Sequence, residues 1–241
     1  MISPTATPDV NTDIVQAAAR RLGAYPLYHY TLGDDFSYPE NWTPAAREYL
    51  ASWTQRRHGD IARLNEAWST AYADFSKVEP VTRAEAAARA GNAAHPDYGA
   101  LCHWVDQQLA REDMLVEFMG ALHQAIREVD PRNPLSIQNT ITYPAPNTGF
   151  DYWKLAGAFG NVGTYGHPMT HDVLRSARRK GSRQSVYSGS YGVYCYEPYE
   201  AMEMYPWWSV FRQMSALNYW YGVPWGNFPG VLAPDLGPLH G

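Results

Sequence analysis

The sequence predicts an α/β fold of the barrel type, in which parallel strands alternate with helices. Strand-like and helical segments alternate five times along the chain, and this alternation is typical of a parallel sheet with crossover helices. The strand-like segments also end in polar or aromatic residues. With 241 residues and 45% hydrophobic content, the chain can fill one core. We therefore expect a single domain over residues 1–241.

The first half of the chain predicts one strand among several helices. Capping signals mark the helix starts, such as Thr12 and the pair Thr43-Pro44, because a threonine oxygen accepts a free backbone N–H and proline suits the first helical position. A long amphipathic pattern follows, and Pro131 closes it. The expected strand is 26–32, and the expected helices are 13–22, 43–57, 60–68, 82–90 and 106–129.

The second half predicts four further strands separated by helices. The strands are expected at 135–140, 161–165, 185–191 and 218–223, and the helices at 151–159, 171–179 and 202–217. Ligands of parallel α/β folds bind outside the carboxyl ends of the strands. The side chains at those ends should therefore converge on one mouth, namely Asp34, Asp35, Asn139, Tyr165, His167, Tyr191, Trp225 and Asn227.

Composition argues against several classes of function. A net charge of -5 with 19 Lys plus Arg offers no basic stripe for nucleic acid. No apolar run reaches the length of a membrane span, and the absence of a signal-peptide pattern favours a cytoplasmic location. Cys102 and Cys195 match no metal spacing and are expected to be ordinary thiols. No pair of histidines has the spacing of a zinc site, and no glycine-rich loop opens a helix after a strand, so neither a metal nor another cofactor is predicted.

Aromatic residues are abundant, at 14% of the chain with 9 Trp and 18 Tyr. Their flat, amphipathic rings can stack on the apolar faces of sugars while their polar tips bond hydroxyl groups. The same residues also fill ordinary cores. Composition alone leaves both interpretations open.

Particular motifs resemble a known family. The stretch Leu32-Gly33-Asp34-Asp35-Phe36-Ser37 is similar to the Leu-Gly-Asp-Glu-x-Ser segment that ends the fourth barrel strand in glycoside hydrolase family 42, the bacterial β-galactosidase family. The run Leu64-Asn65-Glu66-Ala67-Trp68 resembles that family's Leu-Asn-x-Ala-Trp signature. Supporting similarities lie at 127–131, 152–155 and 206–208, so nearly the whole chain is covered.

The resemblance implies a (β/α)₈ TIM barrel that is incomplete, with strands four to eight and their helices. Strands one to three have no counterpart in the sequence. A partial barrel leaves strand edges unpaired and an interior unfilled. We therefore expect either a longer natural protein or an association, such as a homo-oligomer, that covers the edges.

The resemblance also implies a retaining mechanism with two carboxylates. The acid/base position falls on Asp35, where the family has Glu, so the carboxylate is one methylene short. Asp34 is its orienting neighbour or substitute, and either aspartate could instead cap the following turn. The strand that should present the nucleophile contains no carboxylate over 185–192. Glu197 is the first choice for the nucleophile, ahead of Glu200 and Glu203, all of which could equally be surface or first-turn helix charges.

The remaining predicted residues would bind the carbohydrate. Trp225 and Trp220 are expected to be stacking platforms, while His167 could bond a hydroxyl group or be a structural residue. Asn139, Tyr165, Tyr191 and Asn227 complete the expected binding set. Two functions remain open: a retaining glycoside hydrolase for a β-galactoside or related sugar, and a degenerate barrel that binds carbohydrate without cleaving it.

Overall fold

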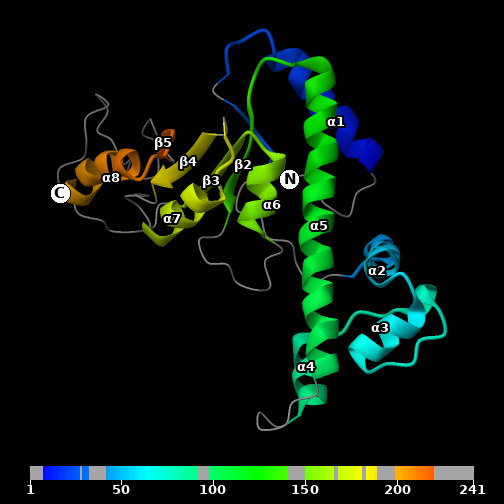
Figure 1. The fold of residues 1–241 in the computed structure, drawn as a ribbon. Helices are drawn as coiled ribbons and strands as arrows, with labels where there is room; N and C mark the ends of the chain where they lie inside the picture. The colour runs from blue at the N-terminus through cyan, green and yellow to red at the C-terminus, as the bar shows by residue number, and fades with distance from the viewer. Residues whose placement is uncertain are drawn as a thin grey trace, which may run out of the picture.

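The fold is a five-stranded parallel sheet with helices on one face, seen in a computed structural model (Figure 1). The structure describes residues 8–27, 29–32, 42–91, 98–140, 150–165, 168–180, 183–188 and 199–219. Its strands are β1 (Tyr30–Thr31), β2 (Leu135–Thr140), β3 (Asn161–Tyr165), β4 (Arg183–Ser188) and β5 (Ala216–Tyr219). They are hydrogen-bonded in sequence order, and each neighbouring pair is parallel. This order is that of a partial (β/α)₈ barrel and confirms the predicted fold class.

The helices follow the predicted order with shifted ends. The side chains of Thr43, Asp60, Thr82 and Asp151 each accept a backbone N–H of the first turn. The prediction of Thr43 as a cap is confirmed, whereas Thr12, the other predicted cap, lies inside α1, which begins at Pro8. The elements are α1 (Pro8–Leu22), α2 (Pro44–His58), α3 (Ile61–Trp68), the 3₁₀ turn η1 (Phe75–Lys77), α4 (Arg83–Ala90), α5 (Tyr98–Val129), α6 (Tyr152–Ala158), α7 (Pro168–Ala177) and α8 (Tyr199–Phe211).

Two element boundaries differ from the sequence prediction in ways that matter. The helix expected over 202–217 ends at Phe211, because Gln213 adopts a positive φ of 63° and residues 216–219 form β5 instead. The long helix expected from residue 106 begins at Tyr98. Its added turns bury Ala100 and His103, so tertiary packing extends the helix beyond its amphipathic pattern.

The main core lies between the sheet and the helices α1, α5, α6 and α7. Side chains alternate across a strand, and Tyr30 points to the helical layer, where its hydroxyl donates to Asp130 at 2.7 Å. His29 therefore lies on the opposite face, where it contacts Asn161. The fully buried members of the core include Leu115, Ile137, Leu155, Val162 and Leu174.

A buried carboxylate fixes the chain at the amino ends of the first two strands. Asp130 is 3% exposed and accepts hydrogen bonds from Tyr30 and from the side chain of Asn133, at 2.7 and 2.6 Å. Burial alone would raise the pKa of Asp130, but these bonds and two backbone N–H groups outweigh it and lower the pKa to about 2. Asn133 also accepts from the backbone of Leu27 at 3.0 Å. This cluster holds the entrance of β1 against β2.

Residues 44–90, hereafter the insertion, form a second core with the first half of α5. Figure 1 shows α5 running past the sheet, with α1 near one end and α2, α3 and α4 around the other. This core contains Leu50, Trp53, Leu64, Trp68, Val78 and Ala110. Since α5 has 32 residues and rises about 1.5 Å per residue, it spans roughly 48 Å and joins the two cores as one rod.

The Leu-Asn-x-Ala-Trp motif has a structural role in this insertion. The Oδ1 atom of Asn65 accepts the backbone N–H of Tyr72 at 2.8 Å and the hydroxyl of Thr70 at 2.9 Å, and its Nδ2 donates to the Tyr72 carbonyl at 2.8 Å. These bonds clasp the turn after α3. Trp68 is fully buried and donates to Asp106 at 2.9 Å. The motif thus ties α3 to α5.

His103 of α5 is buried in its neutral form. Its ring stacks on Trp68 at 3.9 Å between centroids, and its Nε2 lies 3.0 Å from the carbonyl of Glu79. Burial and the charge of Arg89 lower the pKa of His103 to about 4, against an opposite effect of Asp106. The neutral ring can donate to Glu79 through Nε2, which agrees with Nδ1 facing Arg89 at 3.4 Å.

This lowered pKa predicts a loss of stability in mild acid. The unfolded chain takes up a proton at His103 near pH 6.5, whereas the folded chain does so only near pH 4. Above pH 6.5 His103 is neutral in both states and does not lower the free energy of unfolding. As the pH drops to 4, the free energy of unfolding falls by about 3 kcal/mol. Urea unfolding at several pH values measures it. His103→Phe should flatten the slope in this window, and an unchanged slope would contradict the assignment.

None of the helices in the described part of the chain is both long enough and apolar enough to cross a membrane.

Candidate functional site

The carboxyl ends of all five strands lie along one edge of the sheet. The register pairs Thr140 with Thr164, Tyr165 with Tyr187, and Ser188 with Tyr219. Because the strands are parallel and adjacent, the segments that follow them start from a common rim. This rim is the candidate active site.

Two of the predicted binding residues are placed on this rim by their backbone. Asn139 is the penultimate residue of β2 and Tyr165 the last residue of β3. The register shifts between Ile137 and Thr140, so that residues 138 and 139 lie opposite Gly163 alone. Such a bulge re-aims side chains and occurs often at barrel rims beside active sites. Both positions lie at the rim on neighbouring strands, and their binding role stays a prediction.

The other predicted site residues lie outside the described part of the chain. They are the catalytic candidates Asp34, Asp35 and Glu197, and the binding candidates His167, Tyr191, Trp220, Trp225 and Asn227. In the sequence, Asp34 comes two residues after Leu32, whose backbone N–H bonds Ser136 of β2 at 2.9 Å. Trp220 comes directly after the last residue of β5. Their roles and mutual distances remain predictions.

A buried polar pair on α5 was missed by the sequence analysis. Arg111 is 1% exposed and Gln108 is 7% exposed, and the guanidinium of Arg111 donates to Gln108 at 2.6 Å. Helical spacing puts Arg111 on the same side of α5 as Leu115 and Leu122, which pack in the main core. The sequence contains a signal for this pair, because Gln108 and Arg111 continue the apolar stripe of α5 towards the amino end of the helix.

An ion-pair network shows which end of the strands the Arg111 turn of α5 lies beside. Lys154, near the start of α6, contacts Glu112 at 3.1 Å and Asp113 at 2.8 Å. The same Asp113 accepts the indole N–H of Trp53 in α2 at 2.8 Å. Since α6 starts after the connection from the carboxyl end of β2, this turn of α5 lies on the rim side of the sheet. The network joins the insertion to the barrel.

Burial and ion pairing shift the pKa values of the groups in this network. Burial raises the pKa of Glu112, against the opposite effect of Lys154. Burial alone would lower the pKa of Lys154, but hydrogen bonds and charges from Asp113 and Glu112 outweigh it and raise the pKa. Lys154 therefore stays protonated and holds both carboxylates of α5. The residues that the structure describes form no group of three or more His, Cys, Asp or Glu side chains that could hold a metal ion.

A comparison with protein families finds one match. The model of the Beta-galactosidase family, glycoside hydrolase family 42, matches residues 9–224. No curated protein matches the chain by sequence.

Solved structures of this family resemble the fold. A beta-galactosidase from the psychrophilic Marinomonas ef1 has a TM-score of 0.71 and 17% identity, with 96% of this chain and 40% of that chain covered. An exo-carrageenase of family 42 from Bacteroides ovatus has a TM-score of 0.69 and 20% identity, with 89% of this chain and 34% of that chain covered.

A catalytic domain of another glycosidase has a similar fold. The beta-amylase domain from Paenibacillus polymyxa has a TM-score of 0.70 and 13% identity, with 99% of this chain and 67% of that chain covered. At these identities the likeness concerns the fold. The chain spans about 40% of the length of the Marinomonas enzyme.

Proposed function

The chain belongs to glycoside hydrolase family 42, and from that membership we propose that it hydrolyses O-glycosidic bonds in a β-galactoside or a related carbohydrate. The observation that carries this proposal is the family match over residues 9–224. The shared rim of the five parallel strands supports it, because that rim is where barrel enzymes hold their substrates.

The proposed mechanism retains the configuration at the anomeric carbon. Asp35 protonates the glycosidic oxygen while Glu197 attacks the anomeric carbon, which forms a covalent glycosyl-enzyme. Asp35 then removes a proton from a water molecule that hydrolyses this intermediate. We place Asn139, Tyr165, His167 and Tyr191 around the sugar hydroxyl groups, with Trp220, Trp225 and Asn227 at the end of the last strand.

Arg111 supports an electrostatic role for α5 at the rim. A buried guanidinium needs anionic or hydrogen-bonding partners, because desolvation of an isolated charge is costly. A positive charge next to a carboxylate favours its ionised form, and we propose that Arg111 acts in this way on one of the predicted carboxylates. A pair in which one carboxyl is ionised and the other protonated is what the retaining mechanism needs at the start of its cycle.

Carbohydrate binding without cleavage is the second candidate. Two observations favour it: Asp35 stands where the family has Glu, and β4, with the sequence Arg-Gln-Ser-Val-Tyr-Ser, carries no carboxylate. The shorter side chain places the proton about 1.5 Å farther from the glycosidic oxygen. A misplacement of that size can lower the rate by about 100-fold.

Trapping of the covalent intermediate tests the proposal. The protein is incubated with 2,4-dinitrophenyl 2-deoxy-2-fluoro-β-galactoside, whose fluorine slows hydrolysis of the glycosyl-enzyme. We expect release of dinitrophenol and a mass increase of one fluorosugar, located by peptide mapping on Glu197. A label on Glu200 or Glu203 would support the retaining mechanism and assign the nucleophile to that residue instead of Glu197.

The alternative function has a different outcome in the same experiment. A binding protein would show no label and no release of dinitrophenol, while its tryptophan fluorescence would still be quenched by galactosides. Absence of label, turnover and quenching together would reject both candidates. A copy of the chain unfolded in urea controls for non-specific labelling.

A further inference from the structure

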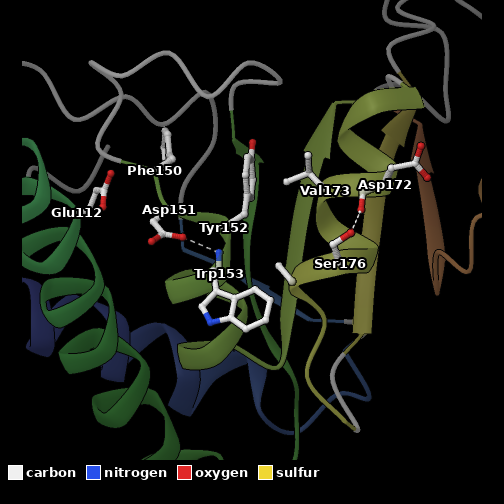
Figure 2. A pocket seen from close by; sticks show the side chains of 9 residues that line it. Glu112, Phe150, Asp151, Tyr152, Trp153, Asp172, Val173 and Ser176 are labelled. Carbon is white, nitrogen blue, oxygen red and sulfur yellow. Dashed lines mark hydrogen bonds between the residues drawn. The ribbon is translucent and has the colours of Figure 1, made fainter.

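The two faces of the sheet differ in what lies over them. Helices cover one face, and Figure 2 shows α6 with Tyr152 and α7 with Val173, which border a groove beside Trp153. On this helical face, Val162 of β3 lies in the main core and Leu217 of β5 packs against it. Since side chains alternate along a strand, every second residue lies on the opposite face. In a (β/α)₈ barrel that opposite face is the interior.

One row of residues crosses three strands on the interior face, at the rim. Asn218 follows Leu217 and is therefore an interior residue of β5. The register pairs Asn218 with Tyr187 of β4, and Tyr187 with Tyr165 of β3. Alternation along β3 from Val162 puts Tyr165 on the same face, so the two assignments agree. Neighbouring strands lie about 4.8 Å apart, so the row spans about 10 Å. We call Tyr165, Tyr187 and Asn218 the rim row.

The rim row is neutral and rich in hydrogen-bonding groups. A tyrosine hydroxyl can donate and accept hydrogen bonds, and so can the carboxamide of Asn218. Groups of this kind match the hydroxyl groups of a sugar, and a tyrosine ring also offers an apolar surface to a sugar ring. The row contains no charge that would attract an anion or a cation. Its chemistry therefore fits a neutral, hydroxyl-rich ligand.

A row of small residues lies one level below the rim row, towards the amino ends of the strands. Gly163 of β3 pairs with Ser185 of β4, and Ser185 pairs with Ala216 of β5. Each lies two residues before a member of the rim row and is therefore on the interior face as well. The interior layers of barrels are usually filled by bulky Val, Ile and Leu side chains. Small residues at this level leave space for a ligand below the rim.

A buried amide lies at the next level of the same face. Asn161 comes two residues before Gly163 and is 2% exposed, and its Nδ2 lies 3.4 Å from Nδ1 of His29. Its Oδ1 is buried, and no donor among the described residues reaches it. A buried carbonyl oxygen needs a donor, which a water molecule or a ligand hydroxyl group can supply. The interior below the rim is therefore polar, at a depth where barrels are usually packed with apolar side chains.

We propose that Tyr187 and Asn218 are specificity-determining residues, which together with Tyr165 bind the hydroxyl groups of one neutral sugar ring at the mouth of this polar interior. The inference rests on the proposed function, because it needs a carbohydrate at the rim. It is independent of which residue is the nucleophile and of whether the sugar is cleaved. It also gives β4, which carries no carboxylate, a role in sugar binding.

Removal of single hydrogen-bonding groups tests the proposal. Binding of methyl β-galactoside is measured by quenching of tryptophan fluorescence in the wild-type chain, Tyr187→Phe and Asn218→Leu. We expect each variant to bind about 3- to 10-fold more weakly, which is the loss for one uncharged hydrogen bond. Unchanged affinity in either variant would overturn the proposal.

A matched control lies on the other face of the same strand. Tyr219→Phe removes the same hydroxyl group from the residue after Asn218, which alternation puts on the helical face. This variant should bind the galactoside as the wild type does. A loss of affinity as large as that of Tyr187→Phe would mean that the face of the sheet does not decide binding, and it would also overturn the proposal.

A second comparison changes the ligand and is insensitive to protein stability. Monodeoxy derivatives of methyl β-galactoside each lack one hydroxyl group. The wild type should bind at least one of them more weakly than the parent sugar, and Tyr187→Phe should lose that discrimination, because the hydrogen bond is then absent from both complexes. The ratio is taken within one variant, so a less stable variant still reports it. Unchanged discrimination contradicts the assignment of Tyr187.

The same measurements separate this inference from the proposed function. Wild-type protein that binds no galactoside would reject both together. Wild-type protein that binds galactosides, with rim-row variants that bind them equally well, would reject this inference alone.

Discussion

Replacement of Asp35 by asparagine is expected to lower the turnover of a β-galactoside with a poor leaving group by at least about 100-fold. An amide cannot give up a proton to the glycosidic oxygen, and general acid catalysis contributes about 10²- to 10⁴-fold. The loss should be smaller for dinitrophenyl galactoside, because this leaving group departs without protonation. The ratio of kcat/KM for the two substrates measures the effect.

A longer carboxylic acid at position 35 should raise the activity. Asp35→Glu extends the carboxyl by one methylene, about 1.5 Å towards the glycosidic oxygen, and restores the residue that the family has at this position. Asp60→Asn is a matched control, because Asp60 is the cap of α3 and asparagine also caps a helix well. If neither substitution at position 35 changes the rate, Asp34 becomes the candidate acid.

Replacement of Trp68 by alanine is expected to lower the free energy of unfolding by about 3–5 kcal/mol, as for other buried aromatic residues. Trp68 is fully buried, stacks on His103 at 3.9 Å and donates to Asp106 at 2.9 Å. Its loss leaves a cavity in the core of the insertion. Hydrogen exchange of the α2 and α3 amides, together with urea unfolding, would measure the effect.

Two further variants separate packing from hydrogen bonding. Trp68→Phe retains an aromatic ring over His103 but removes the donor to Asp106, and about 1–2 kcal/mol of the loss should remain. Trp207→Ala, at a 66% exposed position, should change stability by no more than about 0.5 kcal/mol. Equal effects of Trp68→Ala and Trp207→Ala would show that the insertion does not depend on this core.

Local signals made much of the fold predictable. Thr43, Asp60 and Thr82 act as the caps of their helices, because a cap involves only residues within one turn of each other. The alternation of strands and helices predicted the parallel order, since a crossover connection leaves few other topologies. The helix predicted to reach residue 217 was too long. Gln213 adopts a positive φ after the end of α8, and the sequence has no glycine or asparagine there to indicate it.

The candidate site was predictable only at the level of strand ends. Asn139 and Tyr165 reach one rim because parallel strands must end together. The burial of Arg111 on the part of α5 near that rim was not predicted, because arginine side chains are usually exposed. Arg111 is buried by neighbouring segments of the folded chain. Burial of a charge depends on segments far apart in the sequence, so no local pattern reports it.

The sequence by itself determined the order of elements, the parallel sheet and the family, because periodicity, caps and short motifs act within a few residues of one another. The tertiary structure decided what individual residues do. It made Trp68 and Asn65 structural residues of the insertion, buried the carboxylate of Asp130, and opened the groove beside Trp153. These roles depend on desolvation and on contacts between distant segments, which exist only once the chain has packed.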